Sequence, residues 1–188
     1  MTGRLVLWRG IDAWRAEAAE IEFEHDGLRA RGVQLGSLPH AYRLEYQLDA
    51  TAPGFVTRTL DVQARGEGWA RSLRLSHEEG GQWRMDGDGA GDPHNFAEAL
   101  DCDLAFSPLT NTMPIRRHHL NEREGRETLL IAWVSVPDLV VTPSRQHYTH
   151  IGRATVRYES ESRDFVADLE LDRDGVVIRY PGLAERMS

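Results

Sequence analysis

Apolar and polar residues alternate along much of this chain, and short turns separate the alternating runs. The run HAYRLEYQLD at 40–49 sends its tyrosines and leucines to one face and its charged residues to the other. The runs 55–65, 69–78 and 82–87 continue the pattern after turns of three or four residues. Closely spaced strands of this kind predict an antiparallel meander.

The second half of the chain repeats this organisation. The segments RRHHL and ETLLIAWVSV, joined by NEREG, are predicted to form a hairpin. GRATVRYESE, FVADLELD and DGVVIRY predict three more short strands, and RDG at 173–175 signals a tight turn. With 188 residues and 40% hydrophobic content, residues 1–188 are expected to form a single mainly β domain.

Helix signals are few. Residues 11–19 could form a short helical piece, and NFAEAL at 95–100 could form one or two turns after Pro93. We therefore expect one or two short helices beside the sheet.

The charge and the lack of long apolar runs restrict the partners. A formal net charge of -8 argues against nucleic acid, which needs a basic face. All 22 basic residues are arginine, so a basic side chain in a site would be a planar, permanently charged guanidinium group. The first apolar run is too short for a signal peptide or a membrane span, and a cytoplasmic location is predicted.

Metal and nucleophile candidates are weak. Cys102 lies between two aspartates, which oppose the thiolate form. His118 and His119 are adjacent on a predicted strand and would point to opposite faces. The acidic loop 86–97 resembles part of a calcium loop but has Ala97 where a bidentate glutamate is required. We expect no metal site and no cofactor.

The ingredients of a Ser-His-Asp site are present without a motif that assembles them. No G-x-S-x-G sequence occurs. The candidates are Ser107, Ser135 and Ser144 with His118, His147 and His150.

The tryptophans point to a binding function. Most of the five are expected in the core, but Trp133 sits centrally in a long predicted strand. An aromatic wall with a few arginines suits an amphiphile that has an apolar tail and a polar head.

The segment DLAFSPLTNTMPIRRHHL at 103–120 combines two prolines, small polar residues and cations. Pro108 and Pro114 cannot donate ladder hydrogen bonds, so we predict a bend at a sheet edge. The polar residues between them could satisfy backbone groups or hold a sugar hydroxyl or a phosphate.

Two arginines follow this bend, on a predicted strand. One of Arg116 and Arg117 should face inward and need a partner, either Asp101 or Asp103 or a ligand head group. We favour Arg116 for the ligand because it is nearer the bend.

Three strings resemble a bacterial family described as glycolipid-binding: SPLTNTMPIRR at 107–117, AWVSVPDLVVTPSRQHYTHI at 132–151 and FVADLELDRDGVVIRYPGL at 165–183. The most specific part is SP-L-TN-x-x-PI-RR. That family is similar in fold to periplasmic lipoprotein carriers and mycobacterial lipid-binding lipoproteins. The resemblance implies a curled antiparallel sheet, a spiral β-roll or half-barrel, around an apolar cavity.

The leading hypothesis is a non-catalytic protein that binds a lipid or glycolipid in an apolar groove of the curled sheet. The expected ligand-binding residues are Thr110, Asn111, Arg116, Trp133, Gln146 and Tyr148. One alternative is a hydrolase or isomerase on an amphiphilic substrate with His118 or His147 as base. The other is an oligomeric scaffold without a small ligand, and a homodimer is compatible with the sequence.

Overall fold

The computed structural model describes residues 3–51, 53–78 and 81–187. In these residues fourteen strands form one sheet, in the order β7-β6-β5-β4-β3-β2-β1-β14-β13-β12-β11-β10-β9-β8. The strands are β1 (Arg4–Gly10), β2 (Arg15–Glu24), β3 (Gly27–Gly36), β4 (Tyr42–Ala50), β5 (Thr59–Gly66), β6 (Trp69–His77), β7 (Trp83–Gly87), β8 (Asp101–Leu104), β9 (Arg126–Val134), β10 (Val141–Gly152), β11 (Thr155–Ser160), β12 (Phe165–Leu171), β13 (Val177–Tyr180) and β14 (Ala184–Arg186).

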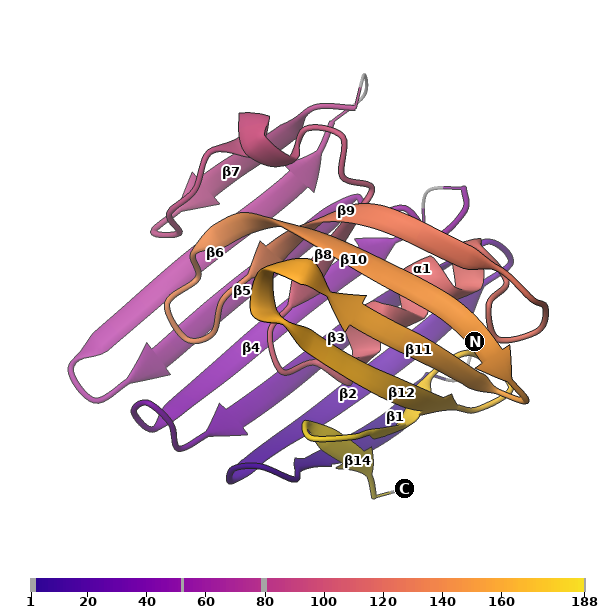
Figure 1. Ribbon diagram of the computed structural model, residues 1–188. Helices are drawn as coiled ribbons and strands as arrows, with labels where there is room; N and C mark the ends of the chain where they lie inside the picture. Colours follow the sequence, from indigo (N-terminus) through magenta and orange to yellow (C-terminus); the bar gives the residue numbers. More distant parts are fainter. Residues whose placement is uncertain (1–2, 52, 79–80, 188) are drawn as a thin grey trace.

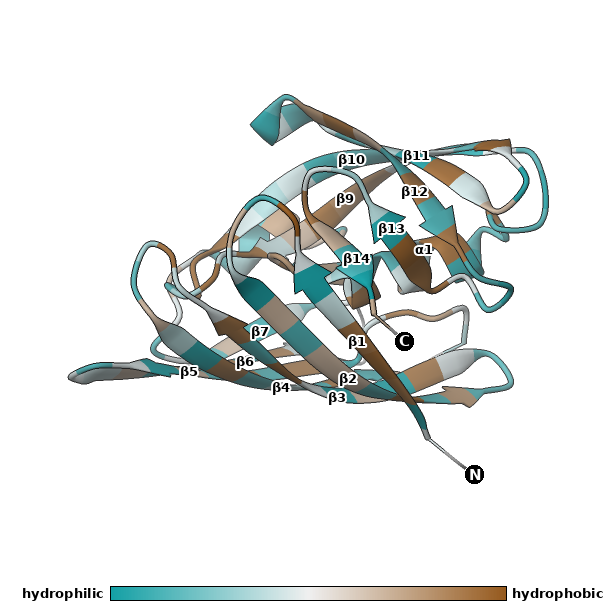
Figure 2. Ribbon diagram, turned by 90° about the horizontal axis from the view of Figure 1, so that it is seen from below, coloured by the Kyte–Doolittle hydropathy of each residue, from teal (hydrophilic) through white to brown (hydrophobic). Residues whose placement is uncertain are grey.

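The predicted fold class is confirmed: the protein is mainly β, and its sheet is curled and antiparallel at nearly every junction. The exception is β8, which pairs with β9 in parallel. The sheet curls into two facing layers, one built from β2–β6 and the other from β9–β12 (Figures 1 and 2). The antiparallel pair of β1 and β14 joins the two halves, with Trp8 opposite Arg186.

Alternation determines which side chains face the interior. In β4 the residues Tyr42, Leu44, Tyr46 and Leu48 are buried, as the sequence predicts, and Arg43 and Gln47 are exposed. The buried apolar side chains form two clusters, one larger and mostly from the first half, the other from the second half. One sheet therefore supplies both walls of its own core.

The prediction of a helix at 11–19 is wrong. β2 begins at Arg15, and Glu17, Ala19 and Ile21 alternate inward along it. Pairing with β1 and β3 on both sides overrides the weak helix preference of an Ala/Glu-rich segment. At 95–100 the structure has only a 3₁₀ helix, Pro93–Phe96.

The segment with the two prolines is also not a bend at a sheet edge. It forms a 3₁₀ helix, Pro108–Asn111, followed by the short helix α1 (Thr112–Arg117). Both prolines occupy first-turn positions, where the missing N–H costs no hydrogen bond. α1 lies between the two layers (Figure 2). Its Met113 belongs to the first core cluster and its Ile115 to the second.

The strand predicted for RRHHL is therefore wrong as well, because Arg116 and Arg117 end α1. The Arg117 guanidinium donates to both carboxylate oxygens of Asp101 on β8, with Nη1 2.6 Å from Oδ1. Only 10% of the Arg117 side chain and 1% of the Asp101 side chain are exposed. Burial disfavours the charged guanidinium, but the Asp101 carboxylate holds the pKa of Arg117 above its ordinary value.

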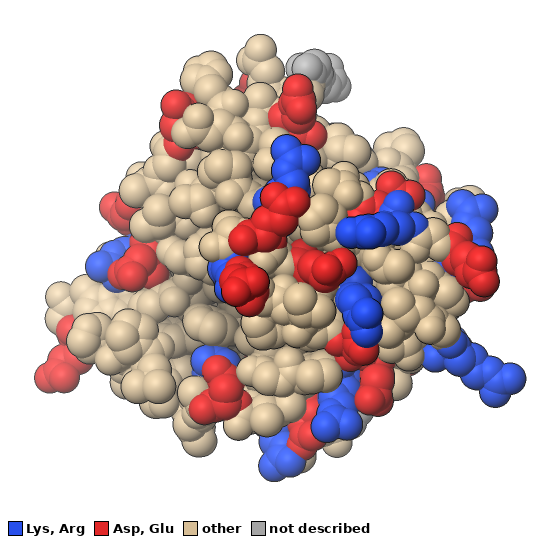
Figure 3. Space-filling model, viewed as in Figure 1, with Lys and Arg blue, Asp and Glu red and all other residues tan. Residues whose placement is uncertain are grey.

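Charges on the outside are mixed. Arg and acidic side chains lie next to one another over the face in Figure 3, without a large area of one sign. Many pair across neighbouring strands, as Arg157 does with Asp168. Within the described ranges, no helix is long and apolar enough to cross a membrane.

The ion pair that holds α1 should be the most sensitive polar contact of the fold. Asp101→Asn leaves a buried guanidinium without its counter-charge and should lower the free energy of unfolding by about 3–5 kcal/mol. The exposed pair of Arg74 and Asp61 is the control, and Asp61→Asn should cost less than about 1 kcal/mol. Urea unfolding followed by tryptophan fluorescence measures both. Equal, small effects would contradict the role given to the ion pair.

Candidate functional site

An apolar cavity of about 290 Å³ lies within the second half of the chain. Its walls come from β8, β9, β12 and β13 and from the loops around them. We call it the apolar cavity, and its lining residues are Asp103, Ala105, Phe106, Ser107, Asn111, Trp133, Arg163, Phe165, Tyr180 and Leu183.

Aromatic rings make up much of this wall. Phe165 on β12 and Tyr180 on β13 pack with their ring centroids 6.0 Å apart. The Arg163 guanidinium lies 4.8 Å from the centroid of the Trp133 ring, in a cation–π contact. Trp133 Nε1 is buried and has no hydrogen-bond acceptor among the described residues. The cavity thus has apolar walls and a few polar groups that could orient a ligand.

A buried polar network supports one side of the cavity. The Asp103 carboxylate accepts hydrogen bonds from Thr110 Oγ1 at 2.9 Å and from Gln146 Nε2 at 2.8 Å. The Tyr148 hydroxyl lies 2.9 Å from Gln146 Oε1 and 3.1 Å from Asn111 Oδ1. The short 3₁₀ helix supplies Thr110 and Asn111, and β10 supplies the other two. The network fixes the orientation of Asp103 and Asn111.

Five of the six residues expected to bind a ligand lie at the apolar cavity or directly behind its wall. Asn111 and Trp133 line the cavity. Thr110, Gln146 and Tyr148 lie behind the wall in the buried network.

Arg116 is placed elsewhere, outside the cavity lining. Its guanidinium lies 5.4 Å from the centroid of the Phe55 ring, and its aliphatic carbons lie against Gly175.

Sequence reasoning missed Arg163, the cation that does line the cavity. It belongs to a short 3₁₀ helix, Glu161–Arg163, between β11 and β12. Its Nη2 donates to the Tyr158 hydroxyl, and its Nε donates to Ser160 Oγ at 3.2 Å. The only sequence signal was a loop cation between two predicted strands.

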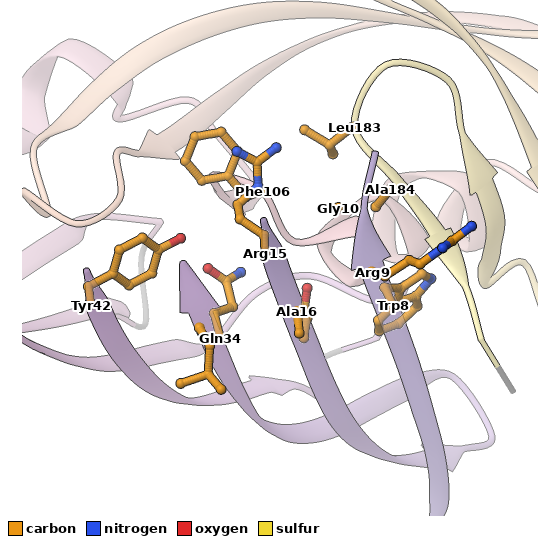
Figure 4. A pocket seen from close by; sticks show the side chains of 12 residues that line it. Trp8, Arg9, Gly10, Arg15, Ala16, Gln34, Tyr42, Phe106, Leu183 and Ala184 are labelled. Atoms are coloured by element: carbon orange, nitrogen blue, oxygen red, sulfur yellow. The ribbon is translucent and has the colours of Figure 1, made fainter. Parts of the chain in front are cut away.

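A second, much smaller cavity lies at the ends of β1–β4. We call it the polar notch, and it has room for about one water-sized group, about 10 Å³. Figure 4 shows the residues that line it; Phe106 and Leu183 also line the apolar cavity, so the two spaces adjoin. The lining residues are Trp8, Arg9, Gly10, Arg15, Ala16, Glu17, Gln34, Leu35, Tyr42, Phe106, Leu183 and Ala184.

Glu17 on β2 is the central acid of the notch. Its Oε1 accepts hydrogen bonds from the Tyr46 hydroxyl at 2.6 Å and from Ser107 Oγ at 2.7 Å. Its Oε2 has no partner in the described part of the chain. Burial raises the pKa of Glu17 to about 7, although the two hydroxyl donors favour the carboxylate.

Two glycines of β3 leave room for the rings of two tyrosines on β4. Gly32 lies opposite Tyr46 and Gly36 opposite Tyr42. A Cβ atom at Gly32 would stand 2.4 Å from the Tyr46 ring, and one at Gly36 would stand 2.3 Å from the Tyr42 ring. Without side chains at these positions the rings can lie flat on β3, which carries the Tyr46 hydroxyl to Glu17 on β2.

Of the predicted catalytic and metal candidates, Ser107 lines the apolar cavity, whereas His118, His147 and Cys102 line neither space. His147 contacts Thr128 and Glu161, and His118 contacts Arg117 and Glu127. Cys102 is buried, and burial together with Asp101 and Asp103 raises the pKa of its thiol to about 12. Within the described residues no group of three or more potential ligands is placed to hold a metal ion.

The raised pKa of Glu17 makes stability depend on pH. The unfolded chain ionises this carboxyl near pH 4.5 and the folded protein near pH 7, so ionisation opposes folding between these values. Relative to Glu17→Gln, the free energy of unfolding of the unmodified protein should fall by about 3 kcal/mol from pH 4.5 to 7 and stay level above. Urea unfolding of both proteins at several pH values measures this. Glu20→Gln, on the exposed face of β2, is the control and should follow the unmodified protein.

Comparison with known proteins agrees with this architecture. A crystal structure of a DUF1089 family protein from Pseudomonas aeruginosa matches with a TM-score of 0.77 and 29% sequence identity over 96% of this chain and 95% of that chain. A search of curated proteins found no match. The model of a family described as "Putative glycolipid-binding" matches residues 5–186. The chain belongs to this family.

Proposed function

We propose that the protein binds a single lipid-like amphiphile of the glycolipid class and does not transform it. The observation that carries this proposal is the apolar cavity, in which aromatic walls adjoin a few fixed polar groups. The family description points to the same ligand class. A volume of about 290 Å³ lies near the lower end of ligand pockets, so it suits one alkyl chain or one ring.

The polar groups at the cavity suit a head group. Arg163 and Asn111 can donate hydrogen bonds, and Asp103 can accept them. An unpaired buried donor costs about 1–3 kcal/mol, and a ligand oxygen that accepts from Trp133 Nε1 would remove this cost. In this proposal Arg163 takes the role first expected of Arg116. Thr110, Gln146 and Tyr148 act indirectly, by holding Asp103 and Asn111.

A cavity-blocking variant tests the proposal. Leu183 lines the cavity and is half-buried, so Leu183→Trp should fill the space without unfolding the protein. Its affinity for n-octyl glucoside, measured by calorimetry below the micelle concentration, should fall about tenfold, because two fewer methylenes would be buried.

The control for this experiment carries the same new side chain elsewhere. Val166 on β12 is 59% exposed and follows Phe165, so it points away from the cavity. Val166→Trp should bind octyl glucoside like the unmodified protein. Equal affinity in both variants would reject the cavity as the binding site, and absence of binding by the unmodified protein would count against the function.

A second candidate is ester hydrolysis, which one contact favours. Ser107 lines the apolar cavity, and its Oγ donates to Glu17, whose pKa of about 7 suits a general base. Ser107 Oγ would attack the ester carbonyl and pass its proton to Glu17. The leaving alcohol would take that proton, and water would then hydrolyse the acyl-serine.

A chromogenic ester separates the two candidates. If the protein only binds its ligand, the unmodified protein and Ser107→Ala should release nitrophenol from p-nitrophenyl octanoate at the same rate. Release that is faster than background and lost in Ser107→Ala would establish the hydrolase instead.

A further inference from the structure

Three buried polar atoms in the polar notch have no hydrogen-bond partner among the described residues. They are Glu17 Oε2, Gln34 Oε1 and the Tyr42 hydroxyl, and each of these residues is at most 5% exposed. Each unsatisfied buried group costs about 1–3 kcal/mol of stability. Native interiors leave few such groups, so three of them around one small space require an explanation.

The three side chains come from neighbouring strands and converge by register. Glu17 on β2 is the direct cross-strand partner of Gln34 on β3, and Tyr42 begins β4, which pairs with β3. Figure 4 shows the Gln34 amide and the Tyr42 hydroxyl beside the Arg15 and Phe106 pair. Adjacent strands therefore aim these polar groups into one place.

We infer that the polar notch is a hydroxyl-binding subsite that takes one hydroxyl of the head group of the bound amphiphile. This inference rests on the proposed function, because the rest of that ligand would occupy the apolar cavity. It adds a chemical requirement: the head group must carry at least one free hydroxyl, as the hydroxymethyl group of a sugar does.

The size of the notch and its hydrogen-bonding groups select a hydroxyl. A volume of about 10 Å³ admits one oxygen-sized group. It is too small for a phosphate or a sulfate. Gln34 Oε1 accepts hydrogen bonds, Glu17 Oε2 accepts them when the carboxyl is ionised, and the Tyr42 hydroxyl can accept or donate one. A hydroxyl can donate to one of the two acceptors and accept from Tyr42. An ionised carboxylate or a phosphate dianion has no hydrogen to donate to Gln34 Oε1 and would be repelled by the ionised Glu17.

The notch and the apolar cavity adjoin, so the inference places one ligand across both. Phe106 and Leu183 form part of both linings. Ser107 lines the apolar cavity and donates to Glu17 in the notch. The Arg15 guanidinium lies 4.0 Å from the centroid of the Phe106 ring. A head group placed beside Phe106 would therefore have the notch on one side and the apolar cavity on the other.

Two tyrosine variants with the same chemistry form a matched test. Tyr42→Phe removes a hydroxyl that has no partner in the described chain and keeps the ring over Gly36. Tyr46→Phe removes a hydroxyl that donates to Glu17. Tyr42→Phe should therefore keep or raise the melting temperature, and Tyr46→Phe should lower it.

Binding is measured by calorimetry with two detergents that share an octyl chain. n-Octyl glucoside carries sugar hydroxyls, and octyldimethylamine N-oxide carries none. Tyr42→Phe should weaken the affinity for the glucoside about three- to tenfold, the effect of losing one hydrogen bond, and leave the affinity for the amine oxide unchanged.

Each of the other outcomes rejects either the hydroxyl-binding subsite alone or the subsite together with the proposed function. Unchanged glucoside affinity in Tyr42→Phe rejects the subsite while the proposed function stands. A melting temperature that falls in Tyr42→Phe as it does in Tyr46→Phe gives the hydroxyl a structural role and also rejects the subsite. Failure of the unmodified protein to bind either detergent rejects the proposed function and the subsite together.

Discussion

The sheet must bury its own apolar face, because no layer of helices covers it in the part of the chain that the structure describes. A flat sheet of this length would leave one side of every strand in water, whereas curling brings the two halves face to face. The halves do not fill the space between them, and the small helix α1 fills part of it with Met113 and Ile115. The buried pair of Asp101 and Arg117 then holds α1 to the sheet.

Strand positions could be predicted from the sequence because alternation has a period of two, which a half-buried strand requires. The runs at 40–49 and 165–172 became β4 and β12 for this reason. The segment 108–117 could not be predicted in the same way, because its prolines are equally compatible with an edge bend and with first-turn helix positions. Only packing between the two layers decides between them.

The residues of the candidate site also differ in whether the sequence could predict them. Asn111 and Trp133 were accessible to sequence reasoning because unusual residues stand out in a polar turn or an apolar strand. Glu17, Gln34 and Tyr42 were not, since each sits in an ordinary alternating run, and their convergence depends on the register of three strands. Their polar atoms have no hydrogen-bond partner among the described residues, which is expected to lower stability.

The antiparallel pairing of β1 with β14 also has a consequence for the order of assembly. Strands β1–β7 can pair with their sequence neighbours as synthesis proceeds, but β1 keeps an open edge until β14 has left the ribosome. Leu183, shared by both cavities, directly precedes β14. The polar notch takes lining residues from both β1 and β14, so it is complete only after these two strands, which lie far apart in the sequence, have paired.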